Sequence, residues 1–543
     1  MTVELDRRSL LQAASFGIGA LALPGNAAAL LAARGFTHDV ASGEPRQHSV
    51  LLWTRYVPSS GDSARLGWQV SATPNFARIA ASGEAVAEGE HDHIVKVVAG
   101  GLAPGRWYYY RFRDRNGRVS PVGRTRTLPD GPVSDFRLAF FSCSNIGFGW
   151  FNAYRHAASR PDIDLMVHVG DYSYEYERGH YPDAKEAVRL IDVVPANETI
   201  HLADYRMRYA AYRSDPDLRL LHRRFPMIAM WDDHESANDS WEGGAQNHQP
   251  ASEGPWSERK AAAVRAYREW LPVSDDTWEA YEIGDLATLF RPETRLTGRS
   301  RQLDLGPALT GQADLNAALT RFRDQAWLDP ARTMMGVEQE RWLADGFRQS
   351  VARGAKWQVL AQQVVMGSLA TPPEAAGWTR PDSSPEARSK IAVGLAASKV
   401  GLPFNFDDWD GYPAARARLL KSALDADANL LVLSGDSHNA WGFDLDLSGT
   451  PAGVEFGGHS VTSPGFEDSL PNVAPADFAR AAIARNRQLK WANTSQRGYV
   501  TVELTPERAT GEWLFMETVR KRSIRLAGTH RMTTVLGARR LSA

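Results

Sequence analysis

Four short apolar runs, each followed at once by side chains that can bind metal ions, constrain this chain more than any other feature. The runs end at Phe141, Val169, Trp231 and Leu433. Their length and composition fit strands that are buried on both faces of a sheet. Because sites in α/β sheets form beyond the carboxyl ends of the strands, we expect the four following segments to meet in space.

The segments that follow the runs contain carboxylates, a phenol, an imidazole and a thiol. They are Ser-Cys-Ser-Asn at 142–145, Gly-Asp-Tyr-Ser-Tyr at 170–174, Asp-Asp-His-Glu at 232–235 and Ser-Gly-Asp-Ser-His-Asn at 434–439. Carboxylates and a tyrosinate suit hard cations such as ferric iron or calcium, and imidazole adds a nitrogen ligand. Two or more such ions can clamp an in-line displacement at phosphorus, with a metal-bound hydroxide as the attacking group. The pattern therefore indicates a metal centre.

The spacing of the remaining elements predicts more than one domain. The chain has 543 residues, which favours two or three domains. Helix-like stretches alternate with the apolar runs, so we expect an α/β fold over 135–520. Residues 36–129 instead contain short strand-like segments and turns, typical of a small all-β domain of the fibronectin-III or immunoglobulin type. We expect 521–543 to be a C-terminal tail.

The N-terminus carries an export pattern. Arg7 and Arg8 precede residues 9–33, which contain no charged side chain. Paired arginines before a mild apolar stretch resemble a twin-arginine signal. Gly and Pro residues interrupt the stretch, which makes a stable membrane span unfavourable. We therefore expect 1–33 to be a signal peptide that the twin-arginine export machinery reads, with a periplasmic or secreted product; an uncleaved anchor or a buried helix is the alternative.

Charge and cysteine content limit the partners. The net charge is −2 and no basic stripe is visible, which argues against a nucleic-acid partner. An anionic substrate would need local positive charge, and a metal cluster is one way to supply it. Cys143 is the only cysteine, so an intramolecular disulfide is excluded and cysteine usage indicates no compartment.

From about residue 36 to beyond 500, the chain resembles the PhoD-type alkaline phosphatase and phosphodiesterase family. Segment 170–174 matches the Gly-Asp-x-x-Tyr pattern of that family and of purple acid phosphatases. Segments 232–235 and 435–438 are similar to the PhoD forms of the Gly-Asn-His-Glu and Gly-His-x-His blocks of metallophosphoesterases, and 409–413 and 454–465 also resemble PhoD segments. The resemblance implies a metallophosphoesterase β-sandwich flanked by helices, acting on small phosphomonoesters or phosphodiesters.

The resemblance also implies a role for each candidate residue. Asp171 would bridge two metal ions, one ferric and one calcium. The ferric site would be completed by Cys143, Tyr174 and His438. The calcium site would contain Asp233 and Asp436, with Asn238 and Asp232 as further candidates. His234 would stabilise the transition-state oxygens or the leaving group, and Asn145 would contact phosphate.

Other functions stay open at this point. A phosphodiesterase that acts on lipid or cell-wall polymer diesters, with a phospholipase D-like outcome, needs the same metals, so the motifs do not separate it from a monoesterase. A non-catalytic surface-binding protein would need an inert large domain, which the intact acidic, histidine and tyrosine segments argue against. A Ser-His-Asp hydrolase is disfavoured because the chain has no Gly-x-Ser-x-Gly segment.

Overall fold

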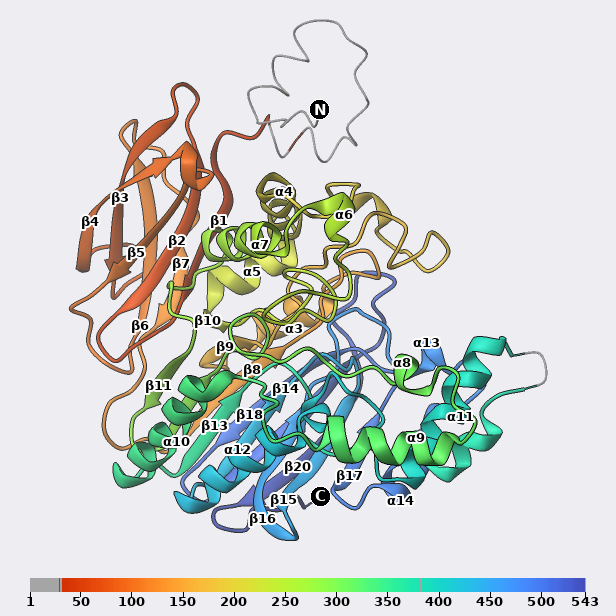
Figure 1. Ribbon diagram of the computed structural model, residues 1–543. Helices are drawn as coiled ribbons and strands as arrows, with labels where there is room; N and C mark the ends of the chain where they lie inside the picture. The colour runs from red at the N-terminus through yellow and green to blue at the C-terminus, as the bar shows by residue number, and fades with distance from the viewer. Residues whose placement is uncertain (1–28, 30–31, 381–382, 543) are drawn as a thin grey trace, which may run out of the picture.

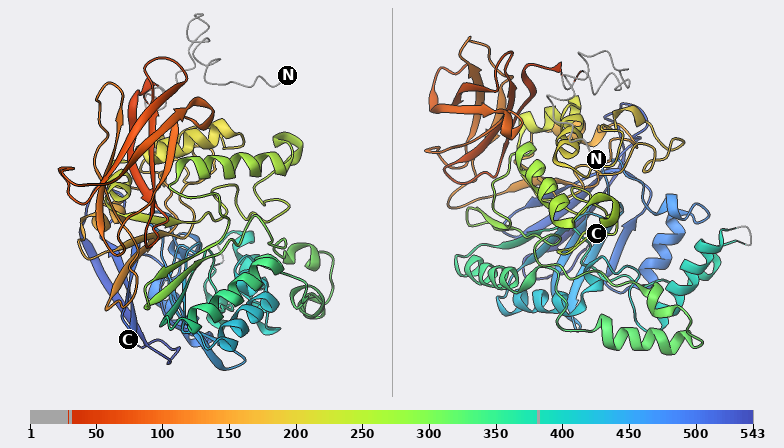
Figure 2. Two further views of the ribbon diagram at one scale, coloured as in Figure 1. Left: turned by 90° about the vertical axis from the view of Figure 1, so that its left-hand side faces the viewer. Right: turned by 45° about the horizontal axis from the view of Figure 1, so that its top comes forward.

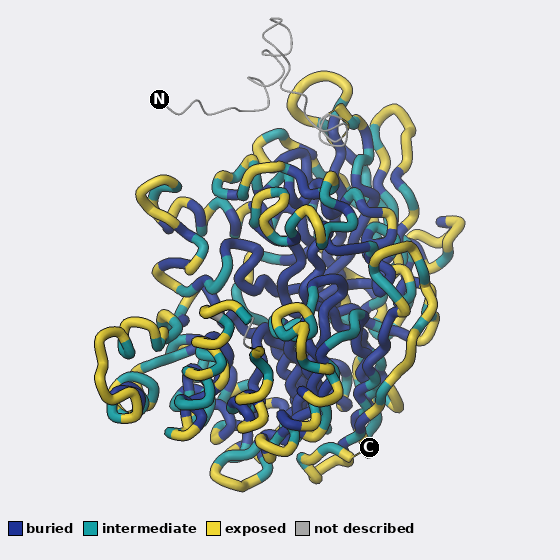
Figure 3. The backbone as a smooth tube through the Cα atoms, turned by 90° about the vertical axis from the view of Figure 1, so that its right-hand side faces the viewer, coloured by how far each residue is buried: buried dark blue, intermediate teal, exposed yellow. Residues whose placement is uncertain are grey.

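The computed structural model describes residues 29, 32–380 and 383–542 (Figure 1). Most of the predicted signal segment 1–33, including both arginines, lies outside the described residues. Three sheets organise the described chain. Buried residues gather in the middle of the molecule, and most exposed segments lie around its outside (Figure 3).

The largest sheet has nine strands and holds three of the four predicted apolar runs. Its central strands β8, β9, β10 and β1 are parallel to one another. The predicted strands are therefore confirmed at β8, β9 and β10. The order across the sheet is β20 (Leu526–Val535), β19 (Arg508–Met516), β18 (Gly498–Leu504), β8 (Phe136–Phe141), β9 (Leu165–His168), β10 (Pro226–Ala229), β1 (Gly35–Gly43), β2 (Val50–Val57) and β5 (Ile94–Ala99).

The second sheet has seven strands and holds the fourth run as β14. Strands β12, β13, β14 and β16 are parallel. The order is β11 (Glu279–Ile283), β12 (Ala287–Arg291), β13 (Trp357–Ala361), β14 (Leu430–Ser434), β16 (Thr450–Gly457), β15 (Ala440–Leu447) and β17 (Leu489–Asn493).

The two large sheets pack face to face. One core cluster joins Leu138 and Val167 of the first sheet to Val359, Leu431 and Phe456 of the second. Helices cover the outer faces through two further clusters. The predicted fold class, a helix-flanked β-sandwich with an all-β N-terminal part, is confirmed (Figures 1 and 2).

The helices are α3 (Asn152–Ser159), α4 (Leu202–Arg213), α5 (Pro216–Arg224), α6 (Pro250–Glu253), α7 (Trp256–Trp270), α8 (Leu305–Leu309), α9 (Leu315–Phe322), α10 (Gly336–Ala352), α11 (Pro385–Lys399), α12 (Pro413–Asp425), α13 (Phe466–Ser469) and α14 (Pro475–Arg485).

The N-terminal β region shares a sheet with the rest of the chain. Its third sheet, β4 (Ile79–Glu88), β3 (Ser63–Ser71), β6 (Trp107–Asp114) and β7 (Gly123–Arg126), packs on β1, β2 and β5. Strand β1 in turn pairs with β10, through Ser42 opposite Pro226 and Gly43 opposite Met227. A Cβ at Gly43 would lie 2.0 Å from the carbonyl oxygen of Pro272, so only glycine fits this junction.

The C-terminal segment 521–543, predicted as a tail, contains the edge strand β20. It pairs with β19 along its length, from Leu526 opposite Met516 to Val535 opposite Arg508. Half of its ten residues are exposed, and the buried ones are Met532 and Thr534. A sequence with so little apolar alternation gives almost no strand signal.

Candidate metal centre

The loops after β8, β9, β10 and β14 converge, as the sequence predicts for strand ends. Among the residues that the structure describes, three groups each bring their donor atoms within 4.8 Å of one another. They are Cys143, Asp171 and His438; Asp171, Asp233 and His234; and Asp232, Asp233 and Asp436. Asp171 belongs to the first two groups, and Asp233 to the last two. The candidates thus form one continuous cluster in which single carboxylates are shared between neighbouring groups.

Four candidate ligands have a left-handed backbone. The φ angles are 58° at Cys143, 55° at Asp171, and 61° at both Asp436 and His438. Residues other than glycine adopt this conformation at a cost and only where the surroundings hold them in it. The chain therefore stores strain at the turns that aim these side chains at one another.

Tyr174 lies beside the first group, and His438 is oriented to present a lone pair to it. The Tyr174 hydroxyl oxygen lies 3.0 Å from Asp171 Oδ2 and 3.2 Å from His438 Nε2. Nδ1 of His438 lies 2.7 Å from the Pro464 carbonyl oxygen, which only an N–H can satisfy, so Nε2 is left for a ligand. Burial lowers the pKa of His438 to about 3, which keeps the ring neutral.

The acidic members of the cluster carry more negative charge than their protein neighbours neutralise. Burial, and then the charges of Asp233 and Asp232, raise the pKa of Asp171 well above its usual value, although His234 opposes them. Burial likewise raises the pKa of the Cys143 thiol, and so does the Asp171 charge. A bound cation would reverse these shifts, since it favours the charged form of every ligand.

Two carboxylate oxygens of the cluster are orphans. Within the described chain, Asp171 Oδ1 and Asp232 Oδ2 are buried without a hydrogen-bond partner. Buried acceptors normally have a partner, and an unmet carboxylate oxygen is the most costly kind to leave without one. The donor set and these two oxygens fit metal ions.

His234 is held by Glu175, which the sequence did not single out. Nδ1 of His234 lies 2.7 Å from Glu175 Oε2, and its ring stacks on Tyr174 with centroids 4.2 Å apart. Burial alone would lower the pKa of His234, but the charges of Asp233, Glu175 and Asp171 raise it well above the usual value. These carboxylates therefore favour the protonated form of the ring, whose Nδ1 is bound to Glu175.

The two asparagine candidates lie beside the cluster rather than within its donor groups. The Asn145 amide is used internally: Nδ2 donates to the Tyr181 carbonyl oxygen and Oδ1 accepts from the Gly147 N–H. Asn238 donates its N–H to Glu175 Oε1, and its Nδ2 donates to Gln246 Oε1. In this arrangement Asn145 shapes the loop that carries Tyr181, and Asn238 helps to fix Glu175.

Sequence reasoning also missed Arg295 and Asp407. Arg295 forms ion pairs with Asp232, Asp407 and Asp436, and Asp407 also pairs with Arg299. Arg295 follows β12 in a stretch without a recognisable motif. A fully buried arginine cannot be told from a surface arginine by its sequence neighbours alone.

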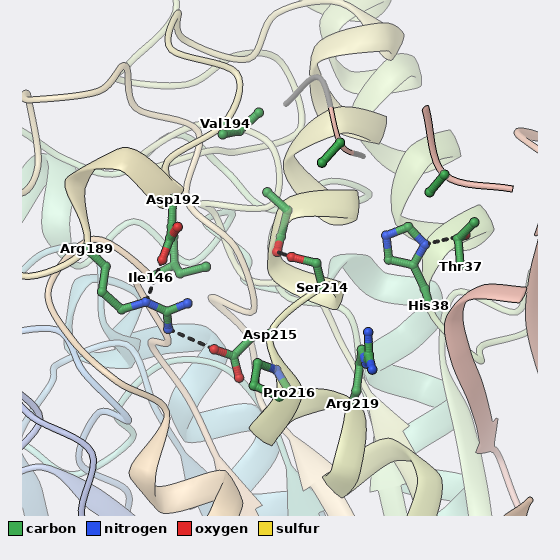
Figure 4. A pocket seen from close by; sticks show the side chains of 13 residues that line it. Thr37, His38, Ile146, Arg189, Asp192, Val194, Ser214, Asp215, Pro216 and Arg219 are labelled. Carbon is green, nitrogen blue, oxygen red and sulfur yellow. Dashed lines mark hydrogen bonds and ion pairs between the residues drawn. The ribbon is translucent and has the colours of Figure 1, made fainter. Parts of the chain in front are cut away.

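A separate cavity of about 320 Å³ is lined by Ile146, and by Arg189 and Arg219 among others (Figure 4). Two guanidinium groups line it, but Arg189 is paired with Asp215 at 2.8 Å and Arg219 with Asp39 at 3.3 Å. None of the predicted metal ligands lines this cavity. Its position and its neutralised charges set it apart from the metal centre.

Comparison with known proteins identifies the family. The profile of the PhoD-like phosphatase family matches residues 138–513, and that of the PhoD-like phosphatase N-terminal domain matches residues 23–129. The chain belongs to the PhoD-like phosphatase family. Like the members of that family, it is a phosphoric ester hydrolase.

Two PhoD-like proteins show how far the similarity extends. Alkaline phosphatase D of Bacillus subtilis (strain 168) is 32% identical over 515 residues, which cover 90% of this chain and 79% of that protein. A solved structure of PhoD superposes with a TM-score of 0.75 at 29% identity, covering 94% of this chain and 92% of that one. The PhoD-like architecture therefore spans both the N-terminal β region and the large sandwich.

Helix length and polarity in the described part of this PhoD-like chain argue against a helical membrane span there. Within those residues, no helix is both long enough and apolar enough to cross a bilayer.

Proposed function

We propose that this phosphoesterase is exported and metal-dependent, and that it hydrolyses phosphomonoesters, phosphodiesters or both at the cluster around Asp171 and Asp233. The observation that carries the proposal is the continuity of the donor groups, in which these two carboxylates are each shared. Shared carboxylates are what a site needs to hold two cations a few ångströms apart.

Charge balance supports metal ions at this cluster. The buried carboxylates in and around it outnumber the cationic side chains, which are His234, Arg295 and Arg299. Uncompensated buried charge is too costly to persist, so cations from solution should complete the site. The buried carboxylates are Asp171, Glu175, Asp232, Asp233, Glu235 and Asp407, and the partly buried Asp436 adds a seventh.

Donor chemistry favours a different ion at each end. Cys143, Tyr174 and His438 would supply thiolate, phenolate and imidazole ligands, which suit ferric iron, and Asp171 would be shared between the two ends. The second end, with Asp233 and Asp436 and with Asp232 and Asn238 as further candidates, offers only oxygen donors and suits calcium. When bound, such ions would supply Lewis acidity and neutralise charge on the phosphoryl group.

His234 would act on the substrate itself. Because Glu175 binds Nδ1, Nε2 is the nitrogen that is left to face a substrate. An imidazolium there can donate a hydrogen bond to a phosphoryl oxygen or a proton to the departing alcohol. The role of Glu175 would be to fix the orientation of the ring and to stabilise its positive charge.

Elemental analysis of protein purified without chelator tests the proposal. We expect iron and calcium in the purified enzyme, with activity lost on chelation and restored by the same metals. A fully active enzyme free of bound metal would refute it. Rates on a nitrophenyl monoester and a bis(nitrophenyl) diester then separate a monoesterase from a phosphodiesterase with a phospholipase D-like outcome.

Export is proposed on the N-terminal sequence. The arginine pair Arg7-Arg8 and the uncharged stretch to residue 33 support a twin-arginine signal and a periplasmic or secreted enzyme. That route carries folded proteins, which suits a centre that must collect its metals before export.

A further inference from the structure

Arg295 stands among the carboxylates of the second donor group. Its Nε lies 2.5 Å from Asp232 Oδ1, its Nη1 2.7 Å from Asp407 Oδ2, and its Nη2 3.0 Å from Asp436 Oδ1. The side chain has no exposed surface. Each of its three nitrogens thus binds a carboxylate from a different loop, as a metal ion would bind ligands from several loops.

Asp232 and Asp436 each use one carboxylate oxygen to bind Arg295 and leave the other oxygen free of that contact. Asp232 binds Arg295 through Oδ1, and its Oδ2 is buried without a hydrogen-bond partner in the described chain. Asp436 also gives Oδ1 to Arg295, and its side chain is 18% exposed. One oxygen of each residue is therefore left for a metal ion, while the other already has a positive partner.

Two alternative roles for Arg295 fit the contacts less well. A substrate-binding arginine must reach the substrate, whereas Arg295 is fully buried and its nitrogens are already bound to carboxylates. A simple anchor for Asp407 is not needed, because Arg299 also binds Asp407 Oδ1 at 2.5 Å. What Arg295 adds is the positive charge between Asp232 and Asp436.

We propose that the guanidinium of Arg295 takes the place of a metal ion, so that Asp232, Asp407 and Asp436 hold one divalent cation fewer than they would otherwise bind. Three carboxylates around one buried point need positive charge, and a planar guanidinium supplies it in a fixed fork that cannot lose its proton. This proposal rests on the proposed metal-dependent function, because it concerns the composition of the same centre.

Counting bound calcium tests the proposal. Apo-protein is dialysed to equilibrium against calcium chloride, and bound calcium per chain is measured for the wild type and for Arg295→Ala. We expect Arg295→Ala to bind one more calcium ion per chain, and Arg295→Lys, which keeps the charge, to match the wild type. Arg259→Gln is the matched control: a fully buried arginine that pairs with Glu198 and Glu253 instead of these three carboxylates, and whose loss should leave the count unchanged.

Arg295→Ala could destabilise the fold, so Arg295→Ala/Asp407→Asn is measured beside it. This double variant removes the cation and one of its ligands together, and we expect its calcium count to equal that of the wild type. An equal or smaller count in folded Arg295→Ala overturns the proposal, as does an additional ion in Arg295→Lys. A wild type that binds no metal of any kind would instead refute the proposed function.

Discussion

Replacing Glu175 by glutamine tests whether His234 works as a held imidazolium. Burial by itself would raise the pKa of Glu175, but His234 and hydrogen bonds from Asn247 and Asn238 lower it, so the carboxylate is ionised. The substitution keeps the shape and removes the charge that His234 Nδ1 binds at 2.7 Å. A hydrogen bond to a charged group contributes about 1.5–3 kcal/mol. If that interaction is strongest in the transition state, kcat should fall roughly 10- to 150-fold.

The choice of substrate separates the two roles of His234. A nitrophenolate departs without a proton, whereas an alkoxide needs one. If His234 protonates the leaving group, Glu175→Gln should slow a methyl ester far more than a nitrophenyl ester. If His234 only binds a phosphoryl oxygen, both rates should fall alike.

The control for Glu175→Gln is Glu455→Gln. Glu455 is equally buried and accepts from the Met366 N–H, the Gly367 N–H and the Ser434 hydroxyl, with no contact to His234. It should change thermal stability without changing the ratio of the two rates. Wild-type kcat on both esters in Glu175→Gln, at normal metal content, would refute the assignment of His234.

Three further outcomes follow from the site and the N-terminus. Asp171→Asn should lose bound metal and at least about 100-fold in activity while the protein still folds, because it removes the shared charge; elemental analysis and circular dichroism check this. Tyr174→Phe should remove the visible charge-transfer band of a ferric phenolate. Tyr172→Phe is the control and should keep the band, because the Tyr172 hydroxyl bonds His222 instead. An active wild type without colour would contradict both expectations. Arg7→Lys with Arg8→Lys should leave the enzyme in the cytoplasm on cell fractionation, and unchanged export would show that the signal is read differently.

The sequence by itself indicated the four strands that precede the candidate site and most of the candidate ligands. Buried parallel strands are short apolar runs, and a loop at a strand end keeps its residues next to that run in the chain. The positions of Cys143, Asp171, Asp233 and His438 after β8, β9, β10 and β14 could therefore be read without coordinates. Their order along the chain also carried the family resemblance, which the comparisons confirm.

Only the tertiary structure decided which distant groups meet. Glu175 finds His234 across 59 residues, and Arg295 reaches Asp436 across 141. Strand β1 joins β10 although the paired residues Ser42 and Pro226 are 184 positions apart, and β20 completes the sheet with hardly any apolar pattern. The physical reason is the same in each case. Local sequence fixes periodicity and turn chemistry, whereas the partner of a buried charge or an edge strand is set by packing between segments that are remote in the chain.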